Sequence, residues 1–293
     1  MITAFDPRVT PSNGRVAHVS LRGKVSADLF VEGEHHSINV SVAPLLVDRG
    51  GARTRELVYG ETFRVLDTDA PYAWGFAERD GYCGWIDAAA LVGPPKIEPT
   101  HFVASARTYA TLEPDIKRVP RPFHLSFGSR VAVVGHVGPW AELAPTAGTV
   151  PTSRYVPTRH LRPLDHLFDT PLDIAKLFLG TPYLWGGNSA FGIDCSGLVQ
   201  AALLACGLPC PGDTDMQEAV LGEPVAGPDK ARPGDLMFWK GHVAFVAEED
   251  RILHANAGYM STVYERTSEA LARIERQGDG PVTSVRRVTP PRE

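Results

Sequence analysis

The first half of the chain alternates short apolar runs with turn residues. Between residues 37 and 163, runs such as 63–66 and 131–134 carry apolar side chains in a pattern close to every second position. A period of two predicts short, half-buried strands. Many short strands at close spacing are typical of small β-barrels or sandwiches.

This β-rich region contains a weak internal repeat. The run YGE at residues 59–61 resembles FGS at residues 127–129, and apolar alternation follows both. Further on, WI at residues 85–86 matches YV at residues 155–156, at an offset of 70 residues. A long period seen twice indicates two tandem copies of one small fold.

We therefore expect an N-terminal extension that packs on two barrels. The extension is assigned to residues 1–38, the first barrel to residues 39–95 and the second to residues 98–163. The proline-rich stretch at residues 93–99 is a natural linker between the copies.

From about residue 165 the pattern changes to helices. Thr170 has the residue type of a helix cap, Pro171 suits the first helical position, and Asp173 is an acid in the first turn. This helix is expected to end at Gly180, and a second, mostly buried helix is predicted over residues 195–206.

Three consecutive strands are predicted after these helices, over residues 236–239, 242–247 and 251–254, with a turn at residues 248–250. A helix pair followed by an antiparallel meander is an α+β arrangement. We assign residues 165–293 to this third domain.

Composition narrows the class of protein. Hydrophobic residues make up 43% and charged residues 22%, as in ordinary globular domains. The net charge of −5 does not suit a phosphate-binding surface, so we expect no nucleic-acid partner. No apolar stretch approaches the ~18 residues of a membrane span, and the first residues do not resemble a signal peptide. We expect a cytoplasmic protein with reduced thiols and no membrane contact.

Cys195 is the best candidate for chemistry. It lies between a glycine-rich loop and an apolar helix, and the N-terminus of a helix stabilises a thiolate and a developing oxyanion. The alternative is a buried, inert cysteine. Cys206 and Cys210 are expected to pack, as is Cys83, and one cysteine pair without a partner pair does not predict a zinc site.

Two histidines follow Cys195 on predicted strands. His242 opens one strand and His254 ends the next, so a hairpin could bring both beside the helix, one as base and one orienting it. They share a face only if paired residue numbers sum to an even value such as 498, which requires an odd loop or a bulge near residues 248–250. The alternative is two polar strand residues with no role.

Five motifs then carry a resemblance. They are GTPYLWGG at residues 180–187, DCSGLVQ at 194–200, RPGDLMFW at 232–239, GHVAFV at 241–246 and LHA at 253–255. In this order they resemble the NlpC family of papain-like cell-wall cysteine peptidases. The two upstream repeats resemble bacterial SH3-like barrels, although the second lacks the DGYxGW motif of residues 80–85.

The resemblance implies a set of roles. Cys195 would be the nucleophile, His242 the general base and His254 the residue that orients it. Tyr183 would stand near the oxyanion or the substrate. No metal and no cofactor are implied.

The layout is similar to that of intracellular γ-D-glutamyl-L-diamino acid endopeptidases, which cleave short murein peptides with a free N-terminal L-Ala. Asp194 and Ser196 would line the pocket for that ammonium, and Tyr82 from the first barrel would close it, with Glu56. A buried ammonium needs a carboxylate partner. Asp194 could equally be a helix cap, Tyr82 a core residue and Glu56 an exposed charge.

Several alternatives stay open. Trp185 is a candidate substrate-binding residue, and the alternative is simple packing, which is more common for such a side chain. The protein could instead be an amidase or D,L-endopeptidase on intact murein, with the barrels as wall-binding modules. It could also be a non-catalytic peptide-binding protein, or transfer the acyl group to an acceptor other than water. No obligate protein partner is implied beyond the murein-derived peptide.

Overall fold

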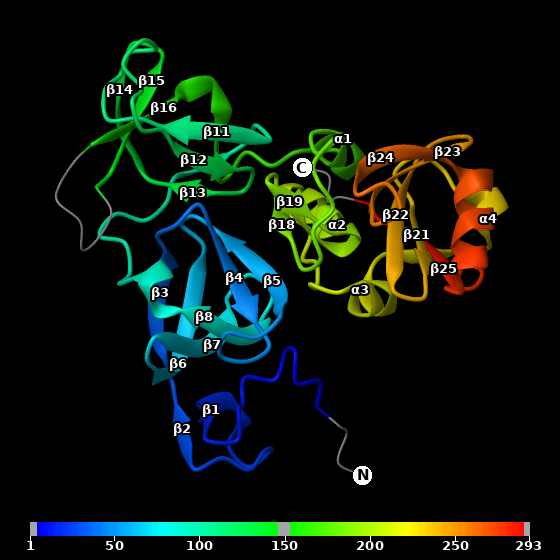
Figure 1. Cartoon of the computed structure of the whole chain (residues 1–293), viewed down its shortest axis with the longest axis horizontal. Helices are drawn as coiled ribbons and strands as arrows, with labels where there is room; N and C mark the ends of the chain where they lie inside the picture. The colour runs from blue at the N-terminus through cyan, green and yellow to red at the C-terminus, as the bar shows by residue number, and fades with distance from the viewer. Residues whose placement is uncertain (1–4, 146–152, 290–293) are drawn as a thin grey trace. The chain divides into compact units, whose positions relative to one another are not determined.

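The computed structural model describes residues 5–145 and 153–289 of the chain. It divides into two compact units, Met1–Leu164 and Asp165–Glu293 (Figure 1). The first is built of strands and the second of helices and an antiparallel sheet, which makes the fold α+β, as the sequence predicts. Residues 146–152, inside the predicted second barrel, lie outside the described residues.

A seven-stranded sheet forms the first barrel, with the order β5-β4-β8-β7-β6-β3-β9. Alternate residues such as Phe63 in β6 and Ile86 in β8 point into its core and are fully buried. The strands are β3 (Glu34–Ile38), β4 (Val42–Leu46), β5 (Arg53–Val58), β6 (Thr62–Asp69), β7 (Tyr72–Ala77), β8 (Cys83–Asp87) and β9 (Leu91–Val92).

The barrel therefore begins at Glu34 and not at residue 39, because β3 pairs with both β6 and β9. The extension before it contains a parallel pair, β1 (Val16–His18) and β2 (Leu29–Val31), joined through a 3-10 turn, η1 (Val19–Leu21). Asn13 and Arg15 tie this pair to the barrel, since both side chains donate to Asp67, at 3.0 and 2.7 Å.

In the residues that the structure describes, the second copy contains three small sheets around its own apolar cluster, which includes Val103, Leu125 and Val156. Its strands are β10 (His101–Val103), β11 (Arg107–Ala110), β12 (Phe123–Ser126), β13 (Arg130–Val131), β14 (Val133–Val137), β15 (Trp140–Leu143), β16 (Arg154–Pro157) and β17 (Leu161–Pro163).

The internal repeat has a structural basis. In both copies a strand leads through one 3-10 turn into a short closing strand, as β8-η2-β9 with η2 (Ala88–Ala90) and as β16-η3-β17 with η3 (Thr158–His160). Gly60 and Gly128 both adopt positive φ, of 78° and 83°. Gly60 also touches the second copy, where a Cβ would overlap the carbonyl oxygen of Arg130.

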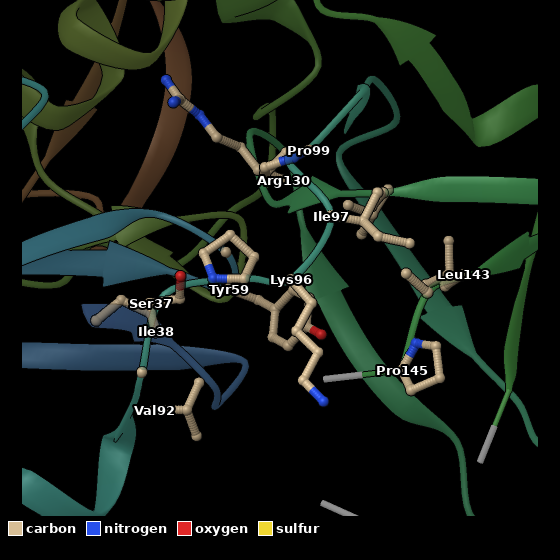
Figure 2. A pocket seen from close by; sticks show the side chains of 16 residues that line it. Ser37, Ile38, Tyr59, Val92, Lys96, Ile97, Pro99, Arg130, Leu143 and Pro145 are labelled. Carbon is tan, nitrogen blue, oxygen red and sulfur yellow. The ribbon is translucent and has the colours of Figure 1, made fainter. Parts of the chain in front are cut away.

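A small cavity lies within the first unit, lined by residues of both copies and of the linker between them (Figure 2). Its volume is about 60 Å³, and Lys96 and Arg130 supply the positive charge of its lining. This volume holds a few water molecules, which is too little for a peptide.

The second unit is organised around a six-stranded antiparallel sheet with the order β20-β25-β21-β22-β23-β24. The strands are β20 (Glu223–Val225), β21 (Leu236–Trp239), β22 (His242–Glu248), β23 (Arg251–Asn256), β24 (Ser261–Arg266) and β25 (Ser284–Arg287). A separate two-stranded hairpin, β18 (Asn188–Ser189) with β19 (Gly192–Ile193), precedes the central helix.

The helices of this unit are α1 (Pro171–Lys176), α2 (Cys195–Ala205), α3 (Thr214–Val220) and α4 (Thr267–Gln277), with a 3-10 turn η4 (Pro228–Lys230). Thr170 is the N-cap residue of α1 and Pro171 occupies its first turn, as predicted, but the Thr170 side chain makes no capping hydrogen bond. α2 packs against β22 and β23. α4 buries Ala270 and Ile274 against the sheet, on the side that carries Trp239 and Ala244.

Candidate active site

Cys195 is the first residue of α2 and is buried. Asp194 caps the helix, because its Oδ1 accepts the backbone N–H of Gly197 at 2.6 Å. The helix start also lies close to the glycine-rich loop, since a Cβ on Gly197 would overlap the carbonyl oxygen of Gly187. The glycines thus hold the loop tightly against the end of the helix that carries the thiol.

The carboxylate of Asp194 is embedded in hydrogen bonds. Besides Gly197, it accepts the Ser196 hydroxyl at 3.0 Å and, on Oδ2, the backbone N–H of Gly186 at 2.9 Å. The capping interpretation of Asp194 is therefore confirmed. The same carboxylate remains part of the site, and its role toward a substrate ammonium stays a prediction.

The thiol of Cys195 lies beside the start of β22. The backbone N–H of Val243, which follows His242, and that of Ser196 donate hydrogen bonds to it, and the Thr214 hydroxyl lies 3.8 Å from Sγ. Burial, with Asp194 nearby, nevertheless raises the pKa of Cys195 to about 11. The expected thiolate stabilisation at the helix N-terminus is thus outweighed, and the resting group is a neutral thiol.

The two histidines lie on one face of the sheet. β22 and β23 pair with Phe245 opposite Leu253 and Val246 opposite Ile252, both sums being 498, and the register shifts before the Glu248–Arg251 pair. The bulge and the even sum that the sequence required are confirmed. His242 Nε2 and His254 Nδ1 are 2.9 Å apart, so the rings are in hydrogen-bond contact.

Burial governs the charge of both rings. It lowers the pKa of His242 to about 3, with the charges of His254 and Arg273 acting in the same direction. Burial also lowers the pKa of His254, against the opposing effect of Glu265. Both imidazoles are therefore neutral at pH 7, and His242 is available to accept a proton.

Sequence reasoning missed the groups behind His254. Glu265 of β24 lies 3.1 Å from His254 Nε2, and Arg273 of α4 binds the same carboxylate through two bonds of 2.7 and 2.9 Å. Asn256 places its amide nitrogen 3.2 Å from the same ring nitrogen. No motif pointed to Glu265 or Arg273, because strand pairing and an unpredicted helix bring them to the site. Thr214 was missed for the same reason.

Tyr183 and Trp185 come from the loop before the hairpin. Burial raises the pKa of Tyr183, and the charges of Cys195 and Asp194 add to the shift, which places the phenol near the thiol. Trp185 is 72% exposed, which disagrees with the packing alternative, and its role in substrate binding stays a prediction. Its side chain is accessible to a ligand.

Tyr82 and Glu56 belong to the first unit. Tyr82 is buried in the core of the first barrel, as the core interpretation expected. Glu56 is also buried and forms an ion pair of 2.8 Å with Arg53, so the interpretation as an exposed charge is wrong. Their predicted contacts with substrate stay predictions.

Within residues 5–145 and 153–289, no group of three or more His, Cys, Asp or Glu side chains is arranged to hold a metal ion. No helix in the described part of the chain is long and apolar enough to cross a membrane.

Two protein families match parts of the chain. Residues 180–273 match the NlpC/P60 family, and residues 47–91 match the bacterial dipeptidyl-peptidase Sh3 domain. The first match contains Cys195, His242, His254 and Glu265, and the second contains Glu56 and Tyr82.

Curated relatives are similar over the same region. Dipeptidyl-peptidase 6 of Lysinibacillus sphaericus is 36% identical over 95 residues, which cover 32% of this chain and 35% of that protein. Gamma-D-glutamyl-L-lysine dipeptidyl-peptidase of Bacillus subtilis (strain 168) is 38% identical over 93 residues, which cover 29% of this chain and 30% of that protein. The similarity thus spans about a third of the length of these relatives.

The fold as a whole is similar to a solved structure. An NlpC/P60 family protein from Bacillus cereus ATCC 10987 matches with a TM-score of 0.74 at 18% identity, over 88% of this chain and all of the other. Together with the family matches and the nucleophile geometry, this shows a papain-like fold with an SH3-like domain before it. The chain therefore carries a cysteine peptidase domain of the NlpC/P60 family, preceded by a bacterial dipeptidyl-peptidase SH3 domain.

Proposed function

We propose that the protein hydrolyses the bond between γ-D-Glu and the L-diamino acid in short murein peptides with a free N-terminal L-Ala. The observation that carries the proposal is the buried Cys195 thiol beside the start of β22, the strand that begins with His242, together with the contact between His242 and His254. The names of the similar proteins support the choice of bond, since two of them are dipeptidyl-peptidases.

The chemistry begins from a neutral pair. Because Cys195 rests as a thiol, His242 removes its proton as Sγ attacks the γ-carbonyl carbon, forming a carbon–sulfur bond and an oxyanion. The backbone N–H groups at the start of α2 favour that negative charge. The imidazolium then protonates the departing amine, and the carbon–nitrogen bond breaks.

A thioester between Cys195 and the L-Ala-γ-D-Glu fragment remains. His242, neutral again, takes a proton from a water that attacks the same carbonyl carbon. The carbon–sulfur bond then breaks, the proton passes from His242 back to Sγ, and the dipeptide leaves as a carboxylic acid. We assign Tyr183, whose pKa responds to the charge of Cys195, to the surroundings of the reacting carbonyl. No oxidant, reductant or cofactor enters this sequence of steps.

Selection of a free N-terminus would rest on Asp194. Its carboxylate is buried one residue before the nucleophile and is held by three donors, Gly186, Ser196 and Gly197. A fixed carboxylate at this place attracts an ammonium and disfavours a blocked, neutral end. The free ammonium belongs to L-Ala, and the cleaved bond follows the γ-carbonyl of the next residue. A carboxylate that binds this ammonium therefore selects for release of a dipeptide.

The test compares L-Ala-γ-D-Glu-L-Lys with its N-acetylated form, using chromatography to follow release of lysine. We expect turnover of the free peptide and a fall in kcat/KM of about 100-fold or more on acetylation, because acetylation removes the positive charge that the Asp194 carboxylate would attract. Cys195→Ala should abolish turnover while the near-ultraviolet circular dichroism stays unchanged.

Equal rates on free and acetylated peptide would remove the ammonium selection. Release of fragments from purified murein sacculi, with no turnover of the tripeptide, would show an enzyme of intact cell wall instead. Wild-type turnover by Cys195→Ala would remove the cysteine peptidase mechanism.

A further inference from the structure

Glu265 and Arg273 extend the histidine pair into a longer chain of contacts. His242 Nε2 meets His254 Nδ1 at 2.9 Å, and His254 Nε2 meets Glu265 Oε2 at 3.1 Å. Arg273 then binds both oxygens of Glu265, at 2.7 and 2.9 Å. These four side chains come from β22, β23, β24 and α4, so the chain of contacts joins four elements that are consecutive in the sequence.

Arg273 and Glu265, at the end of this chain of contacts, determine which atom donates in each of its hydrogen bonds. Arg273 only donates, and an ionised carboxylate only accepts, so Glu265 draws a hydrogen from His254 Nε2. A neutral imidazole carries one N–H, which leaves His254 Nδ1 bare. It therefore accepts from His242 Nε2–H, and the other nitrogen of His242, Nδ1, is left bare as well.

That state is the one in which His242 can act. A bare Nδ1 accepts the proton of the Cys195 thiol, whereas Nδ1–H cannot. If Glu265 carried a proton, it would donate to His254 Nε2, and every hydrogen in the chain would reverse. His242 would then present Nδ1–H and could not serve as a base.

Asn256 does not oppose this order. Its Oδ1 accepts the backbone N–H of Gly258, which fixes the amide with Nδ2 toward the chain. Nδ2 lies 3.2 Å from His254 Nε2 and 3.5 Å from Glu265 Oε2, and a charged acceptor is the stronger partner for its N–H. Without the carboxylate, the same Nδ2 would be a donor facing His254 Nε2 and would favour the reversed order.

We infer that Glu265, held by Arg273, is the positioning residue that sets the tautomer of both histidines and thereby makes His242 a base. The inference rests on the proposed function in one respect, that His242 serves Cys195. It assigns to Glu265 no contact with substrate.

The electrostatics of the site agree with this role. Burial alone would raise the pKa of Glu265, but the hydrogen bonds from His254 and Arg273 lower it to about 2, so the carboxylate is ionised at pH 7. The Glu265 side chain is only 2% exposed and His254 is fully buried, so water competes little for these bonds. In the described residues, the charged and titratable groups around these four side chains are Cys195, Asp194 and Tyr183 on the thiol side, and Tyr259 and Asp279 beside Arg273.

The first test needs no substrate. The ¹⁵N chemical shifts of histidine-labelled protein distinguish protonated from bare ring nitrogens, and His242→Gln and His254→Gln assign the signals. At pH 7 we expect Nε2–H with bare Nδ1 for both residues. In Glu265→Ala we expect Nδ1–H to become the main form of His254, because Asn256 then remains as its neighbour.

The second test is kinetic, with L-Ala-γ-D-Glu-L-Lys as substrate. Glu265→Gln removes the counter-charge of the imidazolium and should lower kcat by about 100-fold with KM within twofold. Glu265→Asp keeps the charge and should recover part of the lost kcat. Glu275→Gln, an exposed acid on the same helix as Arg273, is the matched control and should match the wild type.

A wild-type His254 with Nδ1–H would overturn the inference, as would a folded Glu265→Ala in which His254 keeps Nε2–H. The wild-type spectrum decides even if Glu265→Ala fails to fold. Expected tautomers in a protein that does not cleave the tripeptide would leave the inference standing and refute the substrate assignment alone.

Discussion

At the scale of single residues, burial outweighs the local features that the sequence displays. The helix N-terminus at Cys195 predicts a stabilised thiolate, and the hydrogen bonds from Val243 and Ser196 act in that direction. Removal from water has the larger effect, and it shifts His242 and Cys195 toward their neutral forms. The structure therefore favours proton transfer during attack over an ion pair formed in advance.

This has a consequence for pH dependence. As the proposed base, His242 must be neutral, and its pKa is lowered to about 3, so we expect activity to be retained as pH falls until the pH approaches that value. We expect the acid limb of kcat/KM to lie well below pH 6.5, the ordinary value for an imidazole. An acid limb at pH 6 to 7 would show that His242 titrates as an exposed histidine.

Substitution of Arg273 should shift the pKa of the two histidines in a direction that the structure defines. Its positive charge lowers the pKa of both histidines, so its removal raises them. In Arg273→Met the acid limb of kcat/KM should move toward neutral pH by roughly one unit. Arg276→Met, on the exposed side of the same helix, should leave the profile unchanged. A shift toward lower pH in Arg273→Met would contradict the assigned sign.

At the scale of elements, the sequence predicted those parts of the second unit that have a strong local pattern. The strand Leu236–Trp239 and the starts of β22 and β23 agree with the structure, and α2 ends one residue earlier than predicted. Parity also predicted the bulge that brings His242 and His254 to one face. β24 and α4 were not predicted, and Glu265 and Arg273 went unnoticed with them, because their importance arises from pairing with a distant strand.

A substitution at Gly197 tests the close contact between α2 and the glycine-rich loop. A Cβ there would improve helix propensity by ~1 kcal/mol but would overlap the backbone oxygen of Gly187, and overpacking against backbone costs ~1–3 kcal/mol. We expect Gly197→Ala to lower the urea midpoint and to reduce kcat, because the loop is pushed away from the nucleophile. Gly93→Ala, where a Cβ meets nothing within 4 Å, is the control. A higher midpoint for Gly197→Ala would show that the loop yields without cost.

At the scale of the whole molecule, the chain contains two units with separate apolar cores. The repeat within the first unit was visible in the sequence, but the boundary of its first barrel was not. Glu34–Ile38 is a polar strand with two histidines, so its sequence lacks the apolar alternation that predicts a strand. It forms through pairing with β6 and β9, which its own sequence does not reveal.

Gly60 lets the stability of the first unit be changed selectively. Its φ of 78° and its contact with the carbonyl of Arg130 make Gly60→Ala costly, at about 2–4 kcal/mol. By differential scanning calorimetry we expect the transition of the first unit to move down by about 5–10 °C while that of the second stays in place. Gly81→Ala shares the positive φ but has open space, so its shift should be smaller. Equal shifts in both variants would rule out the contact as the cause.

Because the register shifts between Val246 and Glu248, the length of this surface turn determines whether His242 and His254 lie on the same face of the sheet. Deleting a single residue there would leave a hairpin of ordinary composition and good β propensity, yet it would rotate the second imidazole away from the first. Loops usually tolerate insertions and deletions, but here a change that shifts the strand pairing by one residue would separate the two imidazoles. The catalytic alignment is thus encoded in a segment that takes no part in the chemistry.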